Sequence, residues 1–299
     1  MPDENNQPLN GPPPLPDAGL FGFMTAFGLS NELQKRTVSG LVVAAIALAM
    51  VYVHPLAFAA LAFVLAALMS WEWGRMVRGD GIDTATVVHV VAVLAAAVLT
   101  VMGLAGLGVA AAAIGAITVG SLLIGSGKAP LSFAGVLYTA LPVVALCWLR
   151  GDEPLGFLAA VFVLLTVVVT DTAAFAAGRS IGGPKLWPAI SPNKTWAGLI
   201  GGVSAAALSG ALFSFLTHSG SAIWLAILGL LLGLVAQGGD LAESALKREF
   251  DLKDTSDLIP GHGGAMDRLD GVVTASIAAA LLAFAIDAYA PARALLYGS

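Results

Sequence analysis

The chain has 299 residues, of which 58% are hydrophobic and only 11% are charged, and its mean hydropathy is +0.88. A soluble domain cannot bury that much apolar surface, so the composition indicates a polytopic membrane protein. At ~20 residues per span the length allows up to about ten transmembrane helices and leaves no room for a soluble domain of ordinary size. The formal net charge of -5 says little, because in membrane proteins the location of Lys and Arg carries the information.

The apolar runs predict an all-α protein with about nine transmembrane helices. Residues 1–37 form a Pro-rich tail, expected to be disordered, and a short apolar segment that could lie on the membrane surface. Residues 38–149 hold five spans. Residues 150–299 hold four more and are the candidate functional region, with polar loops at 179–196 and 245–265. We expect spans near 38–53, 56–74, 85–103, 106–124, 134–149, 155–178, 197–217, 221–244 and 266–288.

The basic residues predict the orientation of these spans. With nine spans and a cytoplasmic N-terminus, all 14 lysines and arginines fall on the cytoplasmic side except Arg150 and Arg293. Positive charge concentrates on the cytoplasmic side of membrane proteins, so this distribution supports the topology. It also places both polar loops on the face where nucleotides are found.

Residues 240–270 carry the densest group of charged side chains, between two runs apolar enough to cross a bilayer. Asp267 and Asp270 are three residues apart at the start of the last apolar run. Carboxylates at two facing helix ends can hold a divalent cation, because hard ions take oxygen ligands. Basic side chains and the Gly-rich turn 260–264 can bind phosphates. Spacing of i, i+3, i+4 and i+7 also puts four polar residues on one helix face: Asp240, Glu243, Ser244 and Lys247.

A second informative stretch covers residues 171–198. Asp171 falls near the end of the sixth span, which Gly178 and Arg179 close. Asn193 and Thr195 are candidate N-caps of the seventh span. A helix N-terminus with nearby Ser and Lys side chains can bind an anion, although capping alone would also explain the pattern.

Five carboxylates lie inside or at the end of apolar runs, where an ionised group at a span's centre costs about 2.5–3.5 kcal/mol. A cation or a basic partner must compensate for that cost. An intramembrane salt bridge with Arg248 or Arg268, or solvation at the helix ends, could account for any single residue. Four carboxylates on two adjacent helix ends favour a bound metal. The five are Asp171, Asp240, Glu243, Asp267 and Asp270.

The motifs in both stretches resemble the signature of the phosphatidate cytidylyltransferase (CDP-diacylglycerol synthase) family. The chain departs from the usual pattern at Ala197, where the family often has Glu, and at Ala265, where it carries a larger aliphatic residue. The matching positions are Asp171, Gly178 and Arg179; Ser191, Pro192, Lys194 and Thr195; Ser244, Leu246, Lys247 and Arg248; Lys253, Asp254 and Ser256; and Ile259, Pro260, His262, Gly263, Gly264, Asp267, Arg268 and Asp270.

The resemblance implies CTP and phosphatidic acid as substrates, CDP-diacylglycerol and pyrophosphate as products, and a role in phospholipid biosynthesis. It implies an enzyme of the cell (inner) membrane that faces the cytoplasm, forms a homodimer, uses Mg²⁺ and also K⁺, and takes no nucleic acid. We expect the catalytic residues to be Asp240, Glu243, Lys247, Asp267 and Asp270. The four acidic residues of this set would hold Mg²⁺. We expect substrate contacts from Asp171, Arg179, Ser191, Lys194, Ser244, Arg248, Lys253, Asp254, His262, Gly263, Gly264 and Arg268.

Other polar residues in the apolar runs have simpler interpretations. His89 and His218 are isolated and are expected to be structural. Glu72 and Arg75, in the run W-E-W-G-R, are expected to anchor the second span at the membrane interface. His262 could be a general base, a phosphate donor or a turn residue. We favour a phosphate or cytidine contact, because a phosphate dianion needs no deprotonation to act as a nucleophile.

Three other functions compete. Ion-coupled transporters also carry acidic residues in their spans, but here the charges gather at one face instead of the midplane, and no inverted repeat is evident. The Asp-Gly-x-x-Ala-Arg hallmark of CDP-alcohol phosphotransferases does not occur: Asp80-Gly81 is followed by Ile82-Asp83-Thr84. A purely structural scaffold would not need this density of carboxylates.

Overall fold

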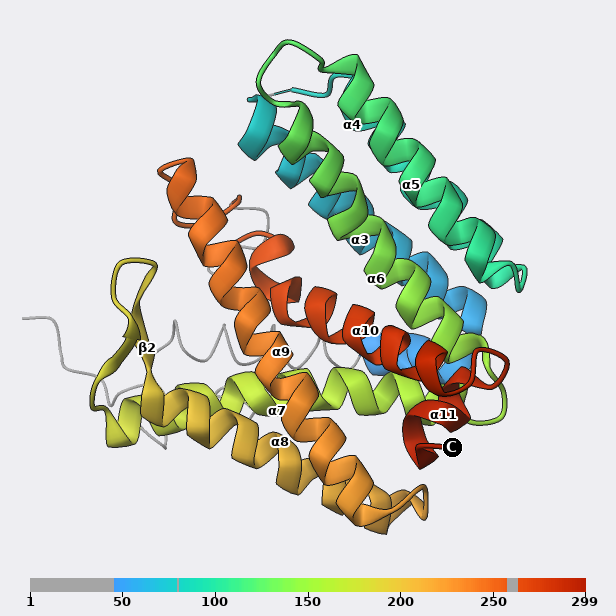
Figure 1. Ribbon diagram of the computed structural model, residues 1–299, viewed down its shortest axis with the longest axis vertical. Coiled ribbons are helices and arrows are strands. Elements are labelled where there is room, and N and C mark those ends of the chain that lie inside the picture. The colour runs from blue at the N-terminus through green and yellow to red at the C-terminus, as the bar shows by residue number, and fades with distance from the viewer. Residues whose placement is uncertain (1–45, 80, 257–262) are drawn as a thin grey trace, which may run out of the picture. The chain divides into compact units, whose positions relative to one another are not determined.

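A computed structural model describes residues 46–79, 81–256 and 263–299 (Figure 1). Within these ranges, eight helices are long and apolar enough to cross a membrane, so the chain is a polytopic all-α membrane protein, as predicted. Most of the first expected span, 38–53, and the whole N-terminal tail lie outside the described residues; residues 46–53 are helical. The eight helices are α3 (Pro55–Arg78), α4 (Thr84–Val101), α5 (Ala105–Leu122), α6 (Ala129–Gly151), α7 (Gly156–Ile181), α8 (Trp196–Thr217), α9 (Ala222–Glu249) and α10 (Met266–Ile286).

Local capping side chains fix several helix starts. The Nδ1 atom of His54 accepts a hydrogen bond from the amide of Leu56 at 3.1 Å, and Pro55 takes the first helical position of α3. The hydroxyl of Thr195 accepts from the amide of Gly198 at 3.0 Å, so Thr195 caps α8, whereas Asn193, the other candidate cap, lies within a strand.

The helices pack in two groups that α10 connects (Figure 1). Helices α3, α4 and α6 contact one another and α5 packs against α4 and α6, whereas α8 packs against both α7 and α9. Helix α10 packs against α9 and α7 on one side and against α6 on the other. A short C-terminal helix, α11 (Pro291–Tyr297), packs against α10, α7, α6 and α9. Met266, the first residue of α10, packs in one apolar cluster with Trp73 of α3 and Leu246 of α9, so the start of α10 lies where the two groups meet.

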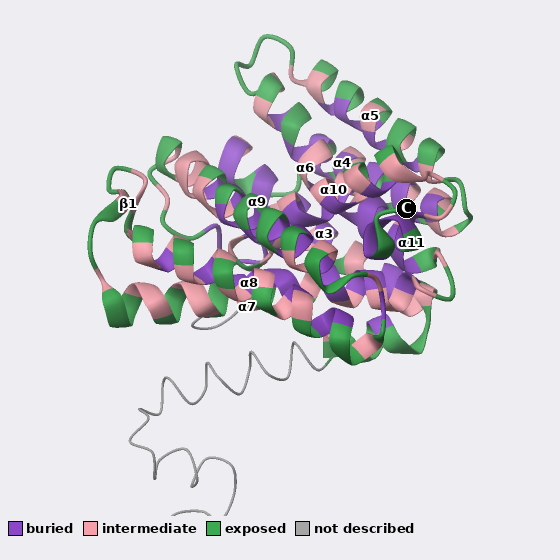
Figure 2. Ribbon diagram, turned by 60° about the horizontal axis from the view of Figure 1, so that its bottom comes forward, coloured by how far each residue is buried: buried purple, intermediate pink, exposed green. Residues whose placement is uncertain are grey.

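Small residues allow the helices to approach closely. On α8, buried small residues recur every four positions, at Gly198, Gly202, Ala206 and Gly210. A Cβ on Gly210 would overlap the backbone carbonyl of Leu225 on α9. Figure 2 shows the buried residues where helices meet and the exposed ones along their outer faces.

The predicted loop 179–196 contains regular structure. Helix α7 continues to Ile181, and an antiparallel hairpin follows, made of β1 (Lys185–Trp187) and β2 (Ser191–Thr195). Lys185 pairs with Thr195, the cap of α8, so the hairpin is built directly onto the start of that helix. In Figure 1 it extends beyond the adjoining ends of α7 and α8.

We predict that Gly210→Ala lowers the stability of the protein by about 1–3 kcal/mol, because the added methyl group forces α8 away from α9. Gly106→Ala is the matched control, since a Cβ there meets no atom within 4 Å and alanine favours the helix. Thermal unfolding in detergent should give a lower Tm for Gly210→Ala only. Equal Tm values for the two variants would contradict the tight α8–α9 contact.

A second prediction concerns Asp83, which caps α4 and pairs with Arg78 at 2.7 Å. Partial burial alone would raise its pKa, but hydrogen bonds from Arg78 and Thr86 outweigh that effect and lower the pKa of Asp83 to about 2. A depressed folded-state pKa stabilises the protein above the unfolded pKa of about 4, and this contribution is lost as the pH falls toward 2. The Tm advantage of wild type over Asp83→Asn should shrink across that window; a constant difference would contradict the ion pair.

Candidate active site

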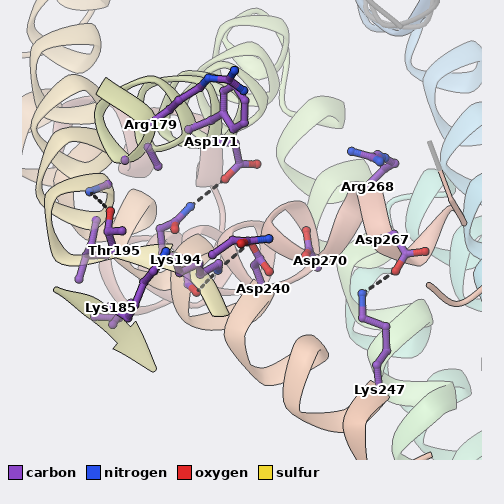
Figure 3. Close-up of a pocket in the computed structure, with 18 of the residues that line it drawn as sticks. Asp171, Arg179, Lys185, Lys194, Thr195, Asp240, Lys247, Asp267, Arg268 and Asp270 are labelled. Atoms are coloured by element: carbon purple, nitrogen blue, oxygen red, sulfur yellow. Dashed lines mark hydrogen bonds and ion pairs between the residues drawn. The ribbon is translucent and has the colours of Figure 1, made fainter. Parts of the chain in front are cut away.

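The predicted polar stretches line one cavity of about 790 Å³ (Figure 3). Its walls come from the end of α7, the hairpin, the start of α8, the second half of α9 and the start of α10. The lining carboxylates are Asp171, Asp240, Asp254, Asp267 and Asp270, and the lining cations are Arg179, Lys185, Lys194, Lys247 and Arg268. Oxygen ligands and basic groups thus face the same space, as a site for a metal ion and phosphates requires.

Lysines neutralise most of the carboxylates that α9 and α10 bring to the cavity. Lys194 pairs with Asp240 at 2.7 Å, and Lys247 pairs with Asp267 at 2.5 Å (Figure 3). Lys247 also lies 3.5 Å from Glu243 one turn earlier on α9. Asp240, Glu243 and Asp267 therefore each have a lysine as a compensating partner. Arg248, one of the arginines considered from the sequence, donates instead to backbone carbonyls of the hairpin and of residue 252.

Glu243 and Asp270 form the least compensated part of the site. The side chain of Glu243 is 1% exposed, and within the described residues neither of its oxygens accepts a hydrogen bond. Its carboxyl group is close enough to Asp270 to interact with it, and Asp270 in turn interacts with Asp240. Glu243 is not among the residues that line the cavity.

Asp267 fixes the connection between α9 and α10. Its Oδ2 atom accepts hydrogen bonds from the amide of Gly264 at 2.8 Å and from the amide and hydroxyl of Thr255 at 2.9 and 3.0 Å. Oδ1 is taken by Lys247. Gly263 has a φ of +81°, a conformation that a larger residue would rarely adopt. Because its oxygens accept hydrogen bonds from Lys247, Thr255 and Gly264, Asp267 stabilises the connection between α9 and α10.

Asp240 and Asp270 are the carboxylates best placed for a metal ion. Within the described residues no group of three or more His, Cys, Asp or Glu side chains could hold a metal by itself. Mg²⁺ is typically bound by one or two carboxylates together with substrate phosphates, so a pair of cavity carboxylates fits such an ion. Both side chains point into the same part of the cavity (Figure 3).

The cavity brings together nine of the predicted site residues, including Asp171, whose Oδ1 accepts from Gln237 at 2.9 Å. The other eight are Arg179, Lys194, Asp240, Lys247, Asp254, Asp267, Arg268 and Asp270. The described residues that do not line it are Glu243, Ser191, Ser244, Arg248, Lys253, Gly263 and Gly264. His262 lies outside the described residues.

Sequence analysis missed Lys185 and Gln237. Lys185 lies between two predicted residues, Arg179 and Lys194, and only the pairing of β1 with β2 turns it toward them. Gln237 lies one turn before Asp240 on the same helix face, and that spacing could have identified it.

The interpretation of Glu72 as an interfacial anchor was wrong. Its side chain is fully buried and accepts hydrogen bonds from the amides of Ala265 and Met266, both at 2.8 Å. Trp73 is also buried, and its Nε1 donates to the carbonyl of Leu131. His89, by contrast, is structural as expected, buried against the hydroxyl of Thr139 at 2.7 Å.

Comparison with known proteins assigns the family. The cytidylyltransferase family matches residues 34–286, a range that contains every residue of the cavity. The chain belongs to the cytidylyltransferase family. A phosphatidate cytidylyltransferase of Brucella suis biovar 1 (strain 1330) is 50% identical over 143 residues, 48% of this chain and 53% of that protein.

Two more distant relatives carry the same name. The phosphatidate cytidylyltransferase of Rickettsia felis is 36% identical over 151 residues, 48% of this chain and 66% of that protein. That of Bacillus subtilis (strain 168) is 36% identical over 142 residues, 46% of this chain and 53% of that protein. The matched segment spans about half to two thirds of the length of these relatives.

We predict that Lys247→Met destabilises this cytidylyltransferase-family protein more than Lys194→Met does. Removing Lys247 leaves Asp267 and Glu243 buried beside each other without a cation, at a cost of about 3 kcal/mol. Lys194 is the matched control, because its partner Asp240 is 31% exposed and water can solvate it. Detergent unfolding should give the lower Tm for Lys247→Met; the reverse order would contradict the role of the Lys247 pairs.

Proposed function

We propose that this chain is a phosphatidate cytidylyltransferase, which joins CTP to phosphatidic acid and releases pyrophosphate. Membership of the cytidylyltransferase family and the names of its relatives support the reaction. The observation that carries the proposal is the cavity, where five carboxylates and five basic side chains meet at the ends of membrane-spanning helices. A nucleotide from water and a phosphate from a lipid can both reach such a place.

We propose that this cavity faces the cytoplasm, because residues 179–194 and 247–268, which build it, hold seven of the 14 lysines and arginines of the chain. CTP is available on that side. Phe175 lines the cavity and is 69% exposed on the outer face of α7, so we propose that the lipid enters beside it while its acyl chains stay in the bilayer. We also propose a homodimer, on the family resemblance alone.

The basic residues divide naturally between the two substrates. Lys194 lies on the hairpin beside Asp240, and we assign the lipid phosphate to it, together with Lys185 and Arg179 from the same wall. Lys247 and Arg268 line the wall formed by α9 and α10, and we assign the triphosphate of CTP to them. Their positive charge would stabilise the pyrophosphate as it leaves.

We propose that Asp240 and Asp270 hold Mg²⁺, and that the buried carboxyl group of Glu243 supports the site through its interaction with Asp270. When bound, Mg²⁺ neutralises charge on the phosphates and aligns them for displacement. This changes one expectation: Asp267, whose oxygens already accept four hydrogen bonds, serves as an anchor and not as a principal ligand. K⁺ stays a prediction with no residue assigned to it.

In the proposed reaction an oxygen of the phosphatidic acid phosphate forms a bond to the α-phosphorus of CTP. The bond from that phosphorus to the oxygen bridging to the β-phosphorus breaks, and pyrophosphate leaves with the electron pair. The attacking phosphate dianion needs no base, so the residues contribute orientation and charge instead of proton transfer. The two walls of the cavity would hold the reacting groups in line.

The experiment that tests this proposal uses the purified chain in detergent with phosphatidic acid, Mg²⁺ and CTP labelled either on the α- or on the γ-phosphate. We expect the α-label to enter a lipid, CDP-diacylglycerol, and the γ-label to enter pyrophosphate, and EDTA to prevent both. A chain that binds CTP but transfers neither label would contradict the proposed reaction.

We predict that Asp240→Asn and Glu243→Gln each lower kcat by about 100-fold or more, because the first removes a proposed metal ligand and the second alters the carboxyl group that interacts with the other ligand, Asp270. Asp83→Asn is the matched control. Asp83 pairs with Arg78 outside the cavity, so the Asp83→Asn variant should keep the activity of the wild type. Full turnover by Glu243→Gln would remove Glu243 from the proposed machinery.

A further inference from the structure

The carboxylate of Glu72 reaches from α3 into the connection between α9 and α10. Its side chain is completely buried, and four donors surround it, all from residues far along the chain. The donors are the Ala265 amide (2.8 Å to Oε1), the Met266 amide (2.8 Å to Oε2), the Ser256 hydroxyl (2.5 Å to Oε1) and the Thr255 hydroxyl (3.4 Å to Oε2).

These contacts replace a cap that the sequence of α10 lacks. The residue at the N-cap position is Ala265, which has no side-chain acceptor, so the first amides of α10 need a partner from elsewhere. Glu72 accepts from two of them, and its negative charge is favourable at the positive end of the helix dipole. The start of α10 is therefore set by a residue of α3.

The same carboxylate holds both sides of the connection. Thr255 and Ser256 come before the stretch 257–262, and Ala265 and Met266 come after it, yet all four donate to Glu72. The hydroxyl of Thr255 has one proton and lies 3.0 Å from Oδ2 of Asp267 and 3.4 Å from Oε2 of Glu72, so it sits between the two carboxylates and can donate to either.

Gly264 is required for this close approach. A Cβ at that position would overlap the Thr255 hydroxyl and would lie 2.5 Å from Oε1 of Glu72. The backbone of the connection therefore packs directly on the carboxylate, with no room for a side chain between them.

We propose that Glu72 is a positioning residue for cytidylyl transfer: by holding residues 255–256 and 264–266, it places the first turn of α10, and with it Asp267 and Asp270, at the cavity. Glu72 itself does not line the cavity. The inference rests on the proposed function for its catalytic consequence, whereas the anchoring of α10 is independent of what the protein catalyses.

The test uses Glu72→Gln in the full-length chain. Glutamine keeps the size of the side chain but turns an NH₂ group toward donors, so at least one amide of α10 loses its acceptor. Because the loss acts on residues behind the cavity, we expect kcat to fall by about 10- to 100-fold. The KM for phosphatidic acid should change less than about threefold, since Arg179, Lys185 and Lys194, which we assign to the lipid phosphate, lie on α7 and the hairpin, outside the displaced turn.

Asp152→Asn is the matched control. Asp152 also accepts from the amide of a helix start, that of Ala292 in α11, at 2.7 Å, but it does not line the cavity. The Asp152→Asn substitution should lower the Tm without changing kcat. If Glu72→Gln and Asp152→Asn lower activity only in proportion to their loss of folded protein, Glu72 is structural and the proposal is wrong.

Hydrogen exchange gives a readout that does not depend on activity. In Glu72→Gln, the amides of residues 264–267 should exchange at least about tenfold faster than in wild type, while the interior of α10 stays protected. Unchanged exchange there would overturn the anchoring. If the wild-type chain made no CDP-diacylglycerol, the proposed function would fail, and faster local exchange in Glu72→Gln would still establish the anchoring.

Discussion

The ion pair between Lys247 and Asp267 is the interaction on which the site depends most. It joins α9 to α10 at 2.5 Å, between side chains that are 12% and 7% exposed. Two helices that end in carboxylates would repel each other inside an apolar bundle, because buried charge is costly unless a partner neutralises it. Lys247 provides that partner for Asp267 and reaches Glu243 as well. The ends of α9 and α10 can then pack together, while other acidic residues of the two helices face the cavity.

Around this pair, structural and chemical carboxylates have separate tasks. Glu72 and Asp267 accept hydrogen bonds from backbone amides and so fix the connection between α9 and α10. Asp240 and Asp270 line the cavity with fewer protein donors. This division explains why so many acidic residues occur in one part of a chain that is otherwise apolar: some hold the backbone, and the rest face the substrates.

Much of this arrangement could be predicted from sequence because its signals are local. Apolar runs of about 20 residues identify spans, and breaks such as His54-Pro55 or the cap at Thr195 identify where helices begin. Carboxylates in apolar runs identified most of the cavity. Glu72 is also a carboxylate in an apolar run. Its role could not be predicted, because its hydrogen-bond donors lie more than 180 positions away in the sequence. Lys185 was missed because its place depends on strand pairing in a short hairpin, which hydropathy does not reveal.

The most direct test of the central claim is an experimental structure of the chain with CTP and Mg²⁺. The account predicts the triphosphate between Lys247 and Arg268, with the α-phosphorus next to Asp240 and Asp270 and with the Lys247–Asp267 pair still holding α9 to α10. Nucleotide bound outside this cavity, or bound within it with no phosphate near either wall of basic residues, would contradict the account.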